Sequence, residues 1–473
     1  MHNSISVNLR YLFFITVILF TACTKNDFSG FGNNIELSAD TIKFDTVFTS
    51  AGSVTKFYLI KNKNSNTLRI DNIQLMGGSA SVFKMNVDGL PGTQFSNLEI
   101  EGNDSLYVFV SVNINPNNNQ LPFIIRDSIQ IQQNGKTIFQ QLEAWGQNAR
   151  YLRSQLITQN TTWNKDLPYV ILGGILVDTF ATLRLEEGTR VYLNADAPMI
   201  IDGQLIVNGT KKDSVVFQGN RLDEPYKNFP GSWPGIIFRE SSKNNEINYA
   251  VIKNAYQGII ADKHSETNAK VKVNNTIIDN IFDIGVLGIN SHLEFNNCLI
   301  SNCGNNLALI YGGTYRFTHC TVSSISNNFI SHKSPVVSLT NFIKRNNQIF
   351  SAALNADFTN CILWGSEGLV ENEIVLEKEG VGLVNINLNH VLFRGKTDPA
   401  NTIFTNVIRN QNPVFNSIDV TNKYFDFRLK KASPAVNAGT IAPLLNNNLF
   451  KLDLDGFDRK DNQPDLGCYE NQD

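Results

Sequence analysis

The chain has 473 residues with a formal net charge of −3, and 42% of its residues are hydrophobic. This length predicts two or three conventional domains, or one long solenoid with a smaller domain, and the apolar fraction is sufficient for a sizeable core. No stretch is dense in Lys and Arg, which argues against nucleic acid as a partner. Frequent Phe, Asn, Thr, Ile and Val favour strands and tight polar turns over helices.

The first 22 residues have the features of a secretory targeting segment. Arg10 and the free amine precede an apolar run over residues 11–20, which is too short to span a bilayer. The run ends in Phe20-Thr-Ala-Cys23, which resembles the lipobox of bacterial lipoprotein signal peptides, with Phe20 where Leu is usual. The resemblance implies an acylated Cys23 held by membrane lipid, followed by a polar tether over residues 23–34. The alternatives are a plain signal peptide and an uncleaved start.

Residues 35–150 are predicted to form a β-sandwich of about seven short strands. Several runs alternate apolar and polar residues with a period of two, as in Leu68–Leu75 and Leu106–Ile114, and turn residues separate them. The phrase Asp104–Val110 resembles one found in immunoglobulin-like domains, and this resemblance implies an antiparallel, Ig-like sandwich. The polar stretch over residues 147–166 is interpreted as the junction with the next domain.

A short phrase recurs six times after the pattern changes near Val170. Each copy is an apolar residue, any residue, an Asn, His or Tyr, a small or aliphatic residue, and two mostly apolar ones. Recurrence at roughly 20 to 50 residues is typical of a solenoid, in which each coil buries its apolar face against its neighbours. The longest interval, between the fourth and fifth copies, indicates either one cryptic coil or a long lateral loop. The copies are Ile247–Ile252, Val273–Ile278, Phe295–Ile300, Phe317–Val322, Phe358–Leu363 and Leu388–Phe393.

This pattern resembles the right-handed parallel β-helix of the pectin-lyase-like superfamily. The resemblance implies an all-β chain, with a β-helix over residues 165–430 and a C-terminal cap over residues 431–473 that covers the open end of the solenoid. Taken with the lipobox, it resembles the β-helix repeat lipoproteins of Gram-negative bacteria. It therefore implies lipid anchoring at the outer membrane or cell surface, with the periplasmic face as the alternative.

The third position of the repeated phrase is predicted to form a ladder of side chains at a tight inward bend. An amide there can donate and accept hydrogen bonds to the coils above and below, and a His is interpreted as a substitute for Asn. The fourth position is a small packed slot, in which cysteines are expected as buried free thiols, with a disulfide or a metal site as alternatives. The ladder consists of Asn275, Asn297, His319, Asn360 and His390, and the slot holds Cys298, Cys320 and Cys361.

A proline-rich insertion over residues 220–234 carries aromatic and hydrogen-bonding side chains suited to stacking on sugar rings. The alternative is a loop that packs these aromatic residues over the coil. Trp364, just after a repeat, is a further candidate on the same grounds. The candidates for ligand contact are Arg221, Tyr226, Phe229, Trp233 and Trp364.

The residues do not favour catalysis. Polygalacturonase-like hydrolases of the pectin-lyase-like superfamily carry the motifs Asn-Thr-Asp, Asp-Asp, Gly-His-Gly and Arg-Ile-Lys. This sequence has none of them. The charged groups Glu367, Glu371, Glu373 and Arg394 are interpreted as scattered solvated turns. The favoured hypothesis is a non-enzymatic envelope protein, structural or polysaccharide-binding, without cofactor or metal. A diverged polysaccharide lyase or glycoside hydrolase is the alternative.

Overall fold

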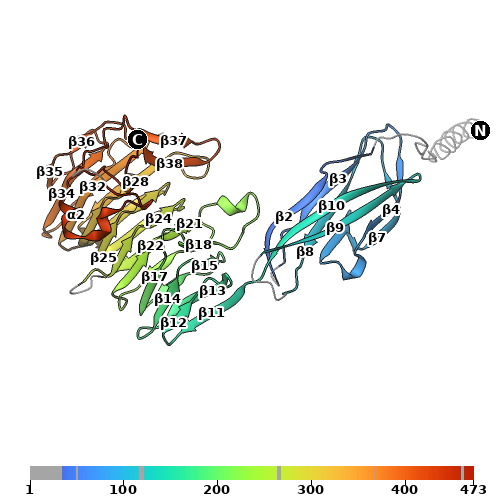
Figure 1. The fold of residues 1–473 in the computed structure, drawn as a ribbon, viewed down its shortest axis with the longest axis horizontal. Coiled ribbons are helices and arrows are strands. Elements are labelled where there is room, and N and C mark those ends of the chain that lie inside the picture. The colour runs from blue at the N-terminus through green and yellow to red at the C-terminus, as the bar shows by residue number, and fades with distance from the viewer. Residues whose placement is uncertain are drawn as a thin grey trace, which may run out of the picture. The chain divides into compact units, whose positions relative to one another are not determined.

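The chain folds as two compact units, Met1–Asn148 and Ala149–Asp473, both built from strands as predicted (Figure 1). The lipobox and the tether lie outside the described residues. Within the described part, no helix combines the length and apolarity needed to cross a bilayer. The structure, a computed structural model, describes residues 35–49, 52–116, 122–263, 268–366, 368–459 and 463–472.

The first unit is a β-sandwich of two five-stranded sheets. Alternation along the strands turns residues such as Tyr58, Ile60 and Val108 into a shared core. Pairing is antiparallel except between β2 and β10, which run parallel. One sheet contains β1 (Ile35–Leu37), β3 (Lys56–Asn62), β8 (Ser105–Val112), β5 (Phe83–Val87) and β6 (Leu90–Gly92). The other contains β2 (Thr41–Phe48), β10 (Lys136–Gln147), β9 (Phe123–Gln133), β4 (Leu68–Leu75) and β7 (Gln94–Ile100). A 3-10 turn, η1 (Gly78–Ala80), precedes β5.

The second unit is a parallel β-helix whose coils pair strand on strand in one 24-stranded sheet. We name its three walls faces A, B and C. Face A contains β16 (Met199–Ile201), β19 (Ile236–Phe238), β22 (Ile259–Asp262), β29 (Val337–Thr340) and β33 (Ile374–Glu377). Face B contains β12 (Thr161–Trp163), β14 (Thr182–Glu186), β17 (Gln204–Asn208), β20 (Asn245–Asn248), β23 (Val271–Asn274) and β35 (Thr402–Thr405). Face C contains β15 (Arg190–Leu193), β18 (Val215–Gly219), β21 (Ala250–Lys253), β24 (Ile277–Asp279), β26 (Leu299–Ser301), β28 (Thr321–Ile325) and β36 (Ile408–Arg409).

Some strands continue around a corner from one face to the next. β25 (Ile284–Asn296) and β27 (Asn305–Thr318) join faces A and B, whereas β32 (Leu354–Ser366) and β34 (Val384–Phe393) join faces B and C. In the first coils, β11 (Arg150–Ile157) and β13 (Tyr169–Val177) each contribute to faces C and A. The coils therefore differ in loop length while keeping one strand register.

All six copies of the repeated phrase lie on consecutive coils, and their first residues are register partners. The column continues in both directions along face B and is part of the solenoid core. Rings of Phe295 and Phe317 stack with centroids 5.1 Å apart, and those of Phe317 and Phe358 are 4.9 Å apart. These spacings match the distance between paired strands. The column is Trp163, Leu185, Val207, Ile247, Val273, Phe295, Phe317, Phe358, Leu388 and Phe404.

The bounds of the solenoid differ from those expected. The stretch over residues 147–166 is not a polar junction, because β11 and β12 lie there and already pair with β13 and β14. Trp163 is buried and stacks on Tyr169 at 4.4 Å, so a core position was mistaken for a linker. The longest interval is not a cryptic coil, because Phe317 and Phe358 are direct partners. The extra residues form a lateral loop over 326–336 and an antiparallel hairpin of β30 (Phe342–Arg345) and β31 (Gln348–Ser351).

The C-terminal segment does not close the end of the solenoid but lies along the outside of face C. The amide of Cys468 donates to Thr321 Oγ1 at 3.1 Å, that of Gly467 donates to the carbonyl of Asn360 at 2.8 Å, and Asp455 pairs with Lys211. These contacts span many coils. The segment begins with an antiparallel hairpin and contains β37 (Phe415–Asp419), β38 (Tyr424–Leu429), α2 (Ala442–Asn446) and η3 (Asn448–Lys451).

The composition of the outward positions of face C explains why the C-terminal segment lies along this face. Leu299, Ile362 and Leu392 lie in one line of outward residues there, with Thr321 between the first two, and water would cover them if the segment capped the end instead. They are buried in a second cluster with side chains of the C-terminal segment. Those side chains include Phe415, Phe427, Leu429, Leu454, Leu466 and Cys468.

This placement predicts a specific chemical cross-link. Carbodiimide joins an ammonium to a carboxylate in contact with it, so we expect peptide mass spectrometry to detect a Lys211–Asp455 linkage. The variant Lys211→Arg keeps the charge but cannot be coupled, and should lose that peptide alone. Coupling of Asp455 to Lys396, near the last coils, would show instead that the segment covers the end.

Candidate functional site

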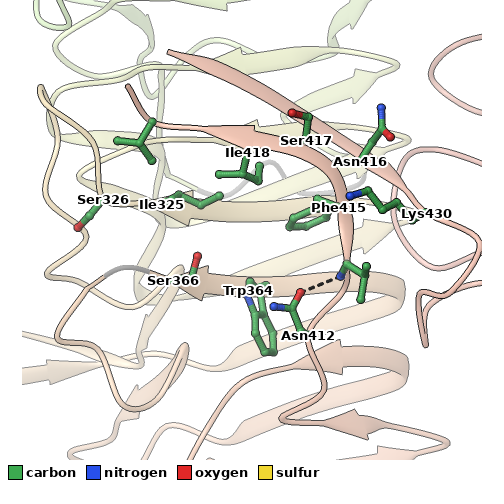
Figure 2. Close-up of a pocket in the computed structure, with 12 residues that line it drawn as sticks. Ile325, Ser326, Trp364, Ser366, Asn412, Phe415, Asn416, Ser417, Ile418 and Lys430 are labelled. Atoms are coloured by element: carbon green, nitrogen blue, oxygen red, sulfur yellow. Dashed lines mark hydrogen bonds between the residues drawn. The ribbon is translucent and has the colours of Figure 1, made fainter. Parts of the chain in front are cut away.

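A groove of about 960 Å³ lies where the C-terminal hairpin crosses the outer side of face C. Figure 2 shows its side chains gathered between the solenoid strands that carry Ile325 and Trp364 and the segment that carries Phe415. Its walls thus come from β28, β32 and β37, which are distant in sequence. The lining residues are Ile325, Ser326, Trp364, Ser366, Asn412, Val414, Phe415, Asn416, Ser417, Ile418, Val420 and Lys430.

The lining combines aromatic and aliphatic surface with hydroxyl and amide groups. Among the described residues that line the groove, Lys430 is the charged one and none carries a carboxylate. Behind its wall, Asn416 Nδ2 donates to Asp426 Oδ2 at 2.8 Å. Burial alone would raise the pKa of Asp426, but hydrogen bonds from Asn416 and Arg428 and the guanidinium charge lower it overall, so the carboxylate stays ionised. The groove therefore offers stacking surface and neutral hydrogen-bonding groups.

The backbone at one side of the groove is held in an uncommon conformation. Val414 has a φ of 50°, in the left-handed region that β-branched residues strongly disfavour. Its amide donates to Asn412 Oδ1 at 2.8 Å, and its carbonyl accepts from the amide of Lys430 at 3.1 Å. These bonds offset a cost on the order of 1–3 kcal/mol. Strain of this kind is concentrated at functional sites, which supports the groove as the candidate site.

A buried acid–base pair lies behind the strand that carries Trp364. His332 Nε2 is 3.0 Å from Glu373 Oε1, and the amide of Val336 donates to Glu373 Oε2 at 3.2 Å. Both side chains are buried, and Arg394 Nη1 lies 3.9 Å from the carboxylate. Neither His332 nor Glu373 lines the groove. The pair ties the lateral loop to the next coil and presents no group to a ligand in the groove.

This pair corrects the interpretation of Glu373 as part of a solvated turn. His332 and Glu373 are 41 residues apart, the same interval that separates Phe317 from Phe358. The strand register beside the pair is different, because Val337 is the partner of Ile374, so the spacing in the sequence did not indicate this contact. Gly365 leaves the room required, since a Cβ there would lie 2.0 Å from His332 Nε2. Glu371 forms an exposed ion pair with Lys396 at 2.6 Å, and Glu367 lies outside the described residues.

The insertion over residues 220–234 gathers most, but not all, of its predicted ligand-binding residues. Arg221 lies over the ring of Tyr226 at 4.1 Å, and Tyr226 and Phe229 meet at 5.2 Å. Phe229 continues onto Phe329 of the lateral loop at 5.1 Å. The carbonyls of Lys227 and Asn228 accept hydrogen bonds from Asn254 and Asn280, which fix the insertion on the coils.

Trp233 is wrongly assigned as a ligand-contact residue. It is only 1% exposed, forms part of the solenoid core and donates from Nε1 to the carbonyl of Lys253 at 2.9 Å. Trp364 does line the groove, where 8% of it remains exposed. Phe329 is three residues from the lining residue Ser326, so their backbones are at most roughly 10 Å apart. The aromatic cluster of the insertion therefore lies near the groove.

The ladder residues all adopt a left-handed backbone at the corner between faces B and C. Their φ angles run from 49° at Asn275 to 55° at Asn360. Asn is the non-glycine residue that best tolerates this region, which explains its recurrence. Some contacts join adjacent coils, as in Asn297 Nδ2 to Asn275 Oδ1 at 3.2 Å and Asn406 Nδ2 to His390 Nε2 at 3.0 Å.

The ladder amides point out of the coil, and not inward as expected. Asn297 Nδ2 donates to the carbonyls of Leu449 and Leu452, and Asn360 exchanges two hydrogen bonds of 2.8 Å with the backbone of Thr440. The C-terminal segment therefore supplies partners that a neighbouring coil does not. The ladder serves as the attachment line for that segment.

His319 is a neutral member of this line. Asn360 Nδ2 faces His319 Nε2 at 2.9 Å, and the Asn360 oxygen accepts from Thr440, so the ring nitrogen acts as an acceptor. Burial, followed by the nearby Arg459 guanidinium, lowers the pKa of His319 well below its usual value. The ring thus stays unprotonated over the physiological pH range and has a structural role.

The cysteines of the fourth repeat position occupy one column of the core. These three, Cys298, Cys320 and Cys361, are free and buried, and so are Cys303 and Cys468, which lie outside the column. Cys298 Sγ lies 3.2 Å from the carbonyl of Asn296, a contact that Thr276 Oγ1 makes to the carbonyl of Asn274 at 2.9 Å. Burial raises the pKa of Cys298 and Cys320 well above the usual value, so both remain thiols. In the described residues, no group of three His, Cys, Asp or Glu converges to hold a metal.

Comparisons with known proteins add little to this geometry. The chain matches no family model and no curated protein sequence. A family 123 glycoside hydrolase from Clostridium perfringens shares 14% identity over 24% of this chain and 26% of its own length, with a TM-score of 0.17. The catalytic unit of a GH87 α-1,3-glucanase from Streptomyces thermodiastaticus shares 11% identity over 75% of this chain and 88% of that chain, with a TM-score of 0.27. Scores this low carry no argument about fold or activity.

The depressed pKa of His319 predicts a loss of stability in acid. In the unfolded chain this imidazole takes up a proton near pH 6.5, whereas in the folded chain it stays unprotonated. As the pH falls below about 6, this group should therefore lower the free energy of unfolding by about 1.4 kcal/mol per pH unit. Urea unfolding from pH 7 to pH 5 measures the slope. The variant His319→Asn keeps a ladder residue without the titration and should show a shallower slope. Equal slopes in the two proteins would contradict a neutral, buried His319.

Proposed function

We propose that this protein is a lipid-anchored, exported protein of the cell envelope that binds polysaccharide along the outer side of face C. The observation that carries the proposal is the groove lined by Trp364 and Phe415 together with hydroxyl and amide groups. The binding role rests on the described residues. The anchor rests on the lipobox resemblance of residues 20–23.

The chemistry of the groove suits sugar rings. A pyranose has an apolar face of C–H groups that stacks on an indole or phenyl ring, and hydroxyls at its edge that need donors and acceptors. Ser326, Ser366 and Ser417 provide groups that both donate and accept. The aromatic cluster of Tyr226, Phe229 and Phe329 lies beyond one end of the groove and extends the surface available to a chain of several sugars.

Binding without turnover is the form that the groove supports best. Glycoside hydrolysis usually requires a pair of carboxyl groups on either side of the scissile bond, and the described lining has none. A lyase would need a base and a second group that neutralises a substrate carboxylate. Lys430 is the one charged side chain among the described lining residues, so it has no such partner there. A diverged lyase or hydrolase remains the second hypothesis, and no contact among the described lining residues favours it.

Replacing Trp364 with leucine should weaken glycan binding while preserving apolar bulk in the wall. Loss of ring stacking is worth on the order of 1 kcal/mol, so we expect a roughly fivefold rise in Kd for the polysaccharide selected on a glycan array. Affinity electrophoresis or calorimetry measures the change. Unfolding in urea confirms that the variant is folded.

The matched control is Phe180→Ala. This aromatic residue is 95% exposed on an early coil and is absent from the groove. It should leave binding unchanged. An array without any bound glycan, or equal loss in both variants, would reject the groove as the binding site. Unsaturated or reducing-end products with any glycan would replace the binding role with an enzymatic one.

Acylation of Cys23 is tested by metabolic labelling. Cells fed an alkyne fatty acid should yield labelled protein in the membrane fraction, and Cys23→Ser should abolish both the label and the membrane association. The other cysteines are buried, so they should remain unlabelled in the folded variant. Label retained in Cys23→Ser, or wild-type protein recovered without lipid, would favour the plain signal peptide.

A further inference from the structure

The β-sandwich exposes an aromatic surface that its own unit does not cover. Phe57 on β3 and Tyr107 and Phe109 on β8 form this surface, which we call the aromatic face. Their ring centroids are 5.7 Å, 6.0 Å and 5.9 Å apart in the three pairs. Phe57 is 56% exposed and Tyr107 43% exposed. Three large rings in mutual contact at the surface are unusual for a solvated strand pair.

The strand register explains why the rings meet. Tyr58 and Ile60 on β3 and Leu106 and Val108 on β8 point into the core, so the residues between them point outward. Phe57 is paired with Phe109, and Leu59 with Tyr107. The outward positions of an exposed sheet are normally polar, whereas here four neighbouring positions are apolar or aromatic.

Among its described residues, the opposite sheet has no three rings in mutual contact, although its exposed Trp145 pairs with the exposed Ile124. Its outward aromatic residues, Phe139 and Trp145, lie on β10 with the outward Gln141 and Glu143 between them. Glu143 also pairs with Arg126 at 2.8 Å. The two sheets therefore differ in the chemistry of their outer faces, and the difference needs an explanation.

The position of Cys23 provides one. Twelve backbone steps separate Cys23 from Ile35, so the first residue of β1 lies within roughly 40 Å of the anchor even at full extension. β1 pairs with β3 in the sheet of the aromatic face, with Ile35 opposite Asn62. Phe57 is five residues from Asn62 along β3, or roughly 17 Å. An acylated Cys23 thus keeps the sandwich within reach of the membrane surface, and the chemistry of its two outer faces decides which sheet meets the lipid.

We propose that the aromatic face rests in the headgroup region of the membrane that holds the acyl chains of Cys23. The proposal depends on the lipid anchor of the proposed function. Aromatic rings partition to the boundary between headgroups and hydrocarbon. Basic side chains border the face, with Lys61 and Lys63 sharing Glu36 and Lys84 nearby on β5, and these favour contact with anionic lipid. The sandwich is thereby oriented on the membrane, and does not hang freely from a tether.

Site-directed spin labelling tests this orientation, because every cysteine other than Cys23 is buried and escapes labelling. The full lipidated protein carrying Phe57→Cys is labelled with a nitroxide, reconstituted into vesicles of phosphatidylethanolamine and phosphatidylglycerol, and purified by flotation. Collision with oxygen and with a water-soluble nickel complex is then measured. We expect the Phe57 label to favour oxygen and a Gln141→Cys label on the opposite sheet to favour nickel. A Tyr107→Cys label should behave like the label at Phe57.

Flotation distinguishes a failure of the lipid anchor from a failure of the proposed orientation. Protein that fails to float has no lipid anchor, and both the anchor and the orientation are then wrong. Protein that floats while the labels at residues 57 and 107 favour nickel, as the label at Gln141 does, keeps the anchor and overturns the orientation. Labels that are immobilised but remain accessible to nickel would show that another protein or a glycan covers the aromatic face, which also overturns it.

Discussion

The rest of the second unit depends on the register between coils. The first residues of successive copies of the repeated phrase are register partners, as Phe295, Phe317 and Phe358 are. Each coil buries its apolar side only against its neighbours. A left-handed residue at the same corner of each repeated coil lets the chain turn without shifting that register. Loops of very different length can then be inserted elsewhere, because they leave the paired strands where they are.

The corner has a second role that follows from the first. An Asn at a left-handed corner directs its amide out of the coil, so a line of polar groups runs beside the outward apolar residues of face C. The C-terminal segment satisfies both, with backbone groups on Asn297 and Asn360 and apolar side chains on Leu299 and Ile362. Buried amides without this segment would lack partners, which makes the segment part of the fold.

The groove is a consequence of this attachment. Where the C-terminal hairpin crosses face C, its Lys423 lies 4.1 Å over the ring of Phe329 in the lateral loop, and Trp364 lines the groove with 8% of its surface exposed. The insertion over residues 220–234 and the lateral loop meet through Phe229 and Phe329 at one end. The candidate site is thus assembled from the longest departures from the repeat, whereas the regular coils contribute only the scaffold.

Periodicity was enough to predict the all-β class, the sandwich and a solenoid, because apolar spacing is a local property that repeats, and the resemblance of the repeated phrase supplied the parallel β-helix. The same local reasoning selected Trp364, Tyr226 and Phe229 as candidates for ligand contact; Trp364 lines the groove, Tyr226 is exposed and Phe229 is partly buried. It could not separate them from Trp233, because burial depends on which coil an aromatic residue faces. It also missed the pair of His332 and Glu373 and the course of the C-terminal segment along face C. Those depend on contacts between residues 41 to more than 150 positions apart, which only the stacking of the coils brings together.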